Sequence, residues 1–84
     1  MVWQIKIEKR AEKELERIPE QFQDKILAVL PLLAVNPYIG KKLKGKYQNL
    51  YSYRVWPYRI TYRIEKNIIT ITVLSISHRQ GAYK

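Results

Sequence analysis

Hydrophobic and polar residues alternate along two neighbouring stretches of the chain, residues 50–55 and 58–65, which are rich in β-branched and aromatic side chains. Trp56 and Pro57 separate the stretches, so the pattern predicts a β-hairpin with its loop at these two residues. Pro57 cannot adopt the positive φ of the common tight hairpin turns. The loop is therefore either wider than two residues or contains a cis peptide bond.

An even-numbered loop centred on Trp56-Pro57 determines which residues of the hairpin face each other. Side chains alternate between the two faces of a strand, and directly opposite residues share a face. One face then carries pairs typical of a core, namely Val55–Tyr58, Tyr53–Ile60 and Tyr51–Tyr62. The other face carries the pairs Arg54–Arg59, Ser52–Thr61 and Leu50–Arg63.

The opposed arginines Arg54 and Arg59 have two interpretations. Like charges directly opposite each other destabilise a sheet, so a chain that keeps such a pair is expected to use it as a rigid cationic site. Alternatively, both are solvated residues on an outer face. The hairpin pattern alone leaves both interpretations open.

A strand and two amphipathic helices are predicted before this hairpin. Residues 2–7 alternate as a half-buried strand, and residues 8–18 have the periodicity of a helix. Pro19 ends this helix and suits the first turn of a second helix. The apolar stripes comprise Ala11, Leu15 and Ile18 in the first helix, and Phe22, Ile26, Val29, Leu30 and Leu33 in the second.

Pro31 lies inside the second helical pattern. It removes a backbone donor and clashes with the preceding turn, so this helix either kinks or ends early. Residues 34–40 contain Asn36-Pro37 and Gly40 and are predicted to form a loop, and residues 65–67 are predicted to form a polar turn. Residues 68–77 are apolar enough on both faces to form a central strand.

The order of these elements predicts an α+β fold in one domain, residues 1–84. An N-terminal strand and a helical hairpin precede a three-stranded antiparallel meander. The helices pack on one face of the sheet, because no other element can cover their apolar stripes. The first strand is expected at an edge, and the pattern does not say beside which strand.

The charged side chains are distributed unevenly along the chain, and this distribution indicates the kind of partner. The net charge is +9, yet residues 1–40 carry six basic and six acidic side chains, whereas residues 41–84 carry ten basic side chains and only Glu65. Such segregation favours a polyanionic partner: nucleic acid, an acidic protein or a membrane surface. A generic solubilising charge is the alternative. The lysine run at residues 41–46 is either a solvated loop or a source of phosphate contacts.

Composition excludes several kinds of chemistry. The chain has no cysteine and one histidine, so disulfides, thiolate metal sites and multi-histidine metal sites are excluded. Glycine-rich phosphate loops are absent, and no cofactor is expected. No apolar run reaches membrane-spanning length, and the N-terminus lacks a signal-peptide core. A cytoplasmic protein that does not associate with a membrane is therefore expected.

The remaining arginine, lysine, histidine and tyrosine side chains suit metal-free cleavage of RNA. In this reaction the 2′-hydroxyl attacks the adjacent phosphate, which requires a base, an acid and cations for the developing charge. His78 could be the base or acid, and arginines could bind the phosphate. Alternatively, His78 is an ordinary surface residue at the end of a strand.

Several segments together resemble the RelE/ParE superfamily of type II toxin–antitoxin toxins, nearer its RelE branch. They are the first strand leading into KRAEKELERIP, the Asn-Pro loop, KKLKG, the hairpin YRVWPYRITYRI and the closing VLSISHRQGAY. The resemblance covers nearly the whole chain and implies the RelE-like fold. It also implies an endoribonuclease (mRNA interferase) that cuts mRNA, typically in the ribosomal A site, and that a cognate antitoxin inhibits.

The resemblance also implies roles for individual residues. Arg59 resembles a phosphate-stabilising arginine, and Arg54 a basic catalytic residue of the neighbouring strand. Arg79 resembles the arginine after the last strand, Tyr83 a C-terminal tyrosine that orients or activates the nucleophile, and His78 an acid or base. RNA-backbone contacts are expected from Lys41, Lys42, Lys44, Lys46 and Arg63. The best-known members carry Lys-x-Lys where this chain has Ser52-Tyr53-Arg54, so the resemblance does not identify the general base.

The implied partners are mRNA, the ribosome with its 16S rRNA, and an acidic antitoxin that wraps the helices or adds a strand. Two other functions stay open. A ParE-like toxin would inhibit DNA gyrase without cutting nucleic acid, and the same scaffold serves both activities. A basic RNA-binding module would bind without any product.

Overall fold

The computed structural model describes residues 2–45 and 49–78 as a mixed sheet with two helices. The strand order is β1-β5-β4-β3-β2, with β1 parallel to β5 and every other pair antiparallel. The elements are β1 (Gln4–Ile7), α1 (Lys9–Glu16), α2 (Glu20–Val35), a 3₁₀ turn (Pro37–Ile39), β2 (Lys41–Lys42), β3 (Leu50–Val55), β4 (Tyr58–Glu65), a 3₁₀ turn (Lys66–Ile68) and β5 (Thr70–His78).

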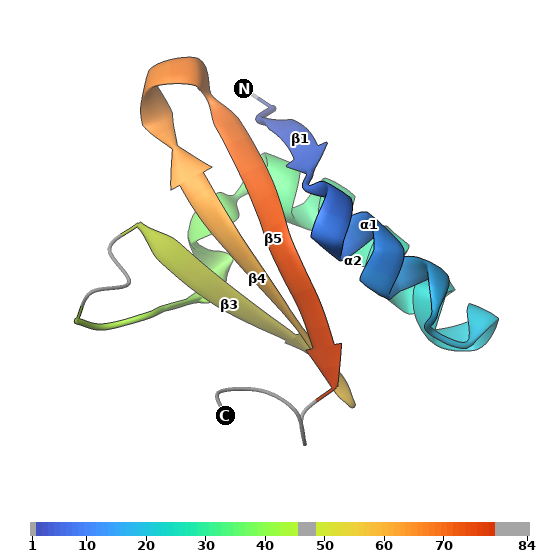
Figure 1. The fold of residues 1–84 in the computed structure, drawn as a ribbon. Coiled ribbons are helices and arrows are strands. Elements are labelled where there is room, and N and C mark those ends of the chain that lie inside the picture. Colours follow the sequence, from blue (N-terminus) through green and yellow to red (C-terminus); the bar gives the residue numbers. More distant parts are fainter. Residues whose placement is uncertain (1, 46–48, 79–84) are drawn as a thin grey trace.

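Both helices pack against one face of the sheet, as predicted (Figure 1). We call this the helix face, and the opposite face, which neither described helix covers, the open face. The core between helices and sheet contains Ala11, Ile18, Ile26, Leu33, Ile60, Tyr62, Ile64, Ile71, Val73 and Ile76. The predicted α+β fold is therefore confirmed.

The hairpin has the predicted register. Each of the six cross-strand pairs between β3 and β4 is the one expected from the alternation, including Arg54 opposite Arg59. The loop consists of Trp56 and Pro57, and the peptide bond between them is cis. Ile60 and Tyr62 are completely buried on the helix face, so the face predicted as core is core.

The lysine run forms a strand in part, so the predicted count of three strands after the helices is too small by one. Lys41 and Lys42 pair with β3 as edge strand β2. Two lysines show no alternation that a sequence could reveal, and their pairing depends on where the chain places them beside β3.

Helix α2 continues through Pro31 to Val35 and does not end early. Leu33 and Ala34, which follow the proline, are buried in the core. An interior proline costs about 3 kcal/mol, and burial of one leucine contributes roughly 1.5–3 kcal/mol. Burial of these two residues thus offsets most of the proline's cost.

Strand β5 lies between β1 and β4, which confirms its predicted interior position and places β1 at an edge. A β-bulge interrupts the pairing of β5 with β4. Tyr62 pairs with Val73, but Thr61 pairs with Ser75, so that Leu74 is the extra residue. Because side chains alternate along a strand, the bulge exchanges the faces of all later residues of β5.

Candidate functional site

The open face carries the two opposed arginines at the hairpin-loop end of the sheet. Arg54 is exposed and Arg59 is partly buried. Ser77 of β5 is the partner of Arg59 on the other side, so a serine borders the arginine pair on the same face. The prediction that the pleat brings Arg54 and Arg59 together is confirmed.

A pocket of about 510 Å³ lies beside this pair, and we call it the arginine pocket. Three cationic side chains reach it from three neighbouring strands, Lys41 from β2, Arg54 from β3 and Arg59 from β4. None of the described residues that line it carries a carboxylate, so the pocket favours an anion. The remaining lining residues are Ile39, Gly40, Leu43, Ser52 and Tyr53.

The wall of the pocket at Gly40 depends on close packing over Tyr62. The Tyr62 hydroxyl donates to the carbonyl oxygen of Pro37 at 2.7 Å. Burial raises the pKa of Tyr62 to about 12, against a smaller lowering by a backbone hydrogen bond from Gly40. A Cβ at Gly40 would collide with the Tyr62 hydroxyl and lie 2.9 Å from the Ser52 carbonyl oxygen. Only glycine therefore lets β2 lie against β3 here.

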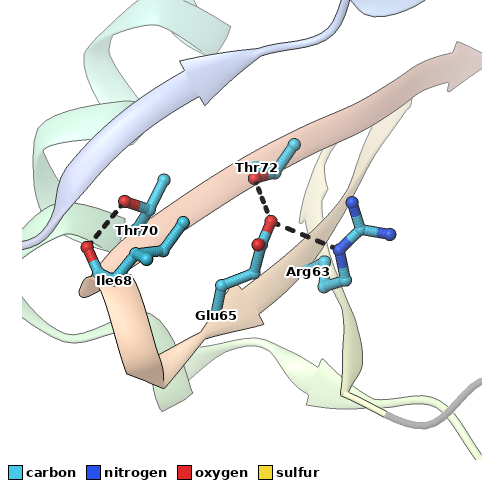
Figure 2. Close-up of polar contacts among 5 residues, drawn as sticks. All are labelled: Arg63, Glu65, Ile68, Thr70 and Thr72. Carbon is cyan, nitrogen blue, oxygen red and sulfur yellow. Dashed lines mark hydrogen bonds and ion pairs between the residues drawn. The ribbon is translucent and has the colours of Figure 1, made fainter.

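The other end of the open face holds a compensated charge cluster, drawn in Figure 2. Glu65 Oε1 accepts hydrogen bonds from Thr72 Oγ1 at 2.7 Å and from Arg63 Nε at 3.4 Å. The bond from Thr72 is the main cause that lowers the pKa of Glu65, with smaller contributions from Arg63 and Lys6. Arg63, predicted to bind RNA, is thus paired with a carboxylate and does not line the arginine pocket.

His78 lies on the other face from the arginines. The bulge places it opposite Tyr58, whose side chain packs on the helix face. The rings of His78 and Tyr58 meet edge to face with their centroids 5.4 Å apart. The centroid of the Tyr58 ring lies 5.5 Å from that of Phe22 in α2. The structure therefore does not bring His78 onto the face of Arg54 and Arg59. Its catalytic role stays a prediction.

The predicted lysines fall into different places. Lys41 lines the arginine pocket, whereas Lys42 and Lys44 line a separate hollow with Leu43 and Gly45. Lys46, Arg79 and Tyr83 lie outside the described residues. Sequence reasoning missed Gly40, and the only signal was its position directly before the lysine run.

Within residues 2–45 and 49–78, no group of three or more His, Asp or Glu side chains is placed to hold a metal ion. Neither helix of the described chain has the length and apolar character needed to cross a bilayer.

Comparison with known proteins finds toxins of one family. The model of a family described as "ParE toxin of type II toxin-antitoxin system, parDE" matches residues 5–83. The curated protein named "Putative toxin RelE1" from Methanocaldococcus jannaschii is 30% identical over 89 residues, which cover 100% of this chain and 98% of that protein.

Solved structures agree in fold. The RelE–RelB complex from Pyrococcus horikoshii OT3 matches with a TM-score of 0.82 and 26% identity, over 98% of this chain and 100% of that chain. The toxin–antitoxin complex RelBE2 from Mycobacterium tuberculosis matches with a TM-score of 0.87 and 23% identity, over 94% of this chain and 100% of that chain. The second similarity shows the fold alone.

Proposed function

Because the chain belongs to the RelE/ParE family of type II toxin–antitoxin toxins, we propose that it is an endoribonuclease that cleaves mRNA in the ribosomal A site. The observation that carries this proposal is the pocket in which Lys41, Arg54 and Arg59 converge without a described carboxylate. Such a pocket matches the phosphate of a single RNA strand, because one arginine can donate two parallel hydrogen bonds to two oxygens of the same phosphate.

The proposed reaction needs no metal ion. The ribose 2′-hydroxyl loses its proton and attacks the adjacent phosphorus, and the bond from phosphorus to the 5′-oxygen breaks. The products are a 2′,3′-cyclic phosphate and a 5′-hydroxyl that has gained a proton. Arg54 and Arg59 would stabilise the extra negative charge on the phosphate oxygens in the transition state. The base and the acid are sought among His78, Tyr83 and Arg54.

An acidic antitoxin is part of the same proposal. The relatives from Pyrococcus horikoshii and Mycobacterium tuberculosis were solved as complexes with antitoxins. The basic excess of residues 41–84 would attract an acidic segment of such a partner. An mRNA substrate, the ribosome with its 16S rRNA and the antitoxin would all place this protein in the cytoplasm.

The test is primer extension on an mRNA in a reconstituted translation reaction. We expect cuts at a fixed position within codons for the wild type and for Arg17→Ala, which removes an exposed arginine from the end of α1. Arg59→Ala is expected to abolish the cuts. His78→Ala then reports whether that histidine transfers a proton from its position beside Tyr58. An uncut message with the wild type would contradict the ribonuclease.

A second candidate function is inhibition of DNA gyrase. The observation that favours it is the matched family itself, which is described as the ParE toxin of parDE systems. Gyrase-dependent DNA breaks on expression, together with an uncut message, would establish this function. Tight RNA binding with neither effect would leave a binding module.

A further inference from the structure

The arginine pocket distinguishes one lysine of the run at residues 41–46. Lys41 is the direct partner of Ser52, so it shares a face with Arg54, which follows Ser52 by two residues on β3. Lys42 is the partner of Tyr51 and belongs to the helix face. We propose that Lys41 is the third phosphate-binding cation of the pocket. This inference rests on the proposed function, because it takes an RNA phosphodiester as the ligand.

The strand order brings the three charges within reach of one phosphate. Strands β2, β3 and β4 are consecutive in the sheet, and neighbouring strands lie about 4.8 Å apart. The outer two backbones are thus about 10 Å apart, a gap that a lysine and an arginine side chain can close from opposite sides. Arg59 and Lys41 would then approach the phosphate from either side of Arg54.

The position of Lys41 is set by packing. Gly40, directly before it, is held against the Tyr62 hydroxyl and the Ser52 carbonyl oxygen, and Lys41 itself is paired in β2. Lys44 lies beyond this strand. A cation on a paired strand loses less conformational entropy on binding than a cation in a loop. Lys41 should therefore contribute more to binding than Lys44, and more than Lys42 because Lys42 belongs to the helix face.

The pocket also has an apolar wall suited to the rest of a nucleotide. Ile39 and Leu43 line it beside the cations. Single-stranded RNA exposes its bases, which pack on aromatic and apolar side chains. The pocket is thus assigned one nucleotide unit, with the phosphate at the three cations and the ribose or base at this wall.

The test measures binding of a fluorescent 2′-O-methyl RNA hexamer, which lacks the attacking hydroxyl and cannot be cleaved. Lys41→Ala and Lys42→Ala remove the same charge from adjacent exposed positions. We expect Lys41→Ala to weaken binding about tenfold and to reduce the slope of log affinity against log salt by about 0.7. Lys42→Ala should weaken binding by about twofold or less.

Equal losses in the two single variants would overturn the proposal, because the lysines would then act only through net charge. An unchanged affinity of Lys41→Ala would overturn it as well. Arg59→Ala is measured in the same assay: if its binding is also normal, the pocket is not the RNA site and the proposed function fails with it. A loss confined to Lys41→Ala and Arg59→Ala, with mRNA left uncut in the reconstituted translation reaction, would keep this inference and reject the ribonuclease.

Discussion

The two ends of the open face hold their arginines in different ways. At the hairpin-loop end, Arg54 stands opposite Arg59 beside a pocket with no carboxylate among its described lining residues. At the other end, Arg63 donates to Glu65, which Thr72 also holds. The same sheet therefore pairs an arginine with a carboxylate at one end and gathers three cationic side chains around a pocket at the other. We interpret the pairing of Arg63 with Glu65 as structural and the pocket beside Arg54 and Arg59 as a site for an anion.

Among the variants that test this comparison, Arg54→Ala should have the largest effect on activity. Removing one donor to the transition state should lower the rate of mRNA cleavage about 10²- to 10³-fold. Stability should rise slightly or stay unchanged, because a repulsion of roughly 0.2–1 kcal/mol between opposed like charges disappears. Cleavage rates and urea unfolding midpoints on the same preparation check both parts. A variant that loses activity only because it unfolds would show that Arg54 is structural.

Gly40→Ala is expected to damage the pocket end through packing alone. The added methyl group meets the Tyr62 hydroxyl and the Ser52 carbonyl oxygen, neither of which has room to move. Overpacking of this kind costs about 1–3 kcal/mol. Thermal unfolding measures the loss. Gly45→Asn is the control, because a Cβ at Gly45 meets no atom within 4 Å and asparagine tolerates its positive φ. Equal losses in both variants would contradict the packing explanation.

Tyr62 should limit stability in alkali. Its pKa is raised to about 12 in the folded protein from an ordinary value of 10.0. The neutral hydroxyl stabilises the fold fully below pH 10, and this contribution of about 2–3 kcal/mol is lost as the pH rises from 10 toward 12. Urea unfolding at pH 8 and at pH 11 tests this. Tyr62→Phe should be less stable at pH 8 and should lose less between the two pH values. An equal loss in both proteins would contradict the assignment.

The compensated end should show the smallest effect, at acid pH. Hydrogen bonds lower the pKa of Glu65 below its ordinary value of 4.5, so its carboxylate stabilises the fold above that pH. This contribution is lost as the pH falls through the lowered pKa of the folded state. Glu65→Gln should flatten the decline of stability on the acid side, with mRNA cleavage near neutral pH almost unchanged. A large loss of cleavage would show that this end takes part in the site.

The sequence by itself determined the hairpin and the opposition of Arg54 and Arg59. Both follow from the alternation of side chains and from a loop of two residues, which are contacts between neighbours in the chain. It also determined the two helices and the single face that they cover, because their apolar stripes had one surface to bury. The basic excess of the second half is a further property of the sequence alone.

Only the tertiary structure decided three further features of the molecule. The pairing of β2 with β3 depends on Gly40 packing over Tyr62, and it puts Lys41 in the pocket. The bulge at Leu74 turns His78 toward Tyr58 and away from the arginines. The parallel pairing of β1 with β5 places residues 4–7 beside residues 70–73. Each depends on contacts between residues distant in sequence, and local periodicity carries no information about such contacts.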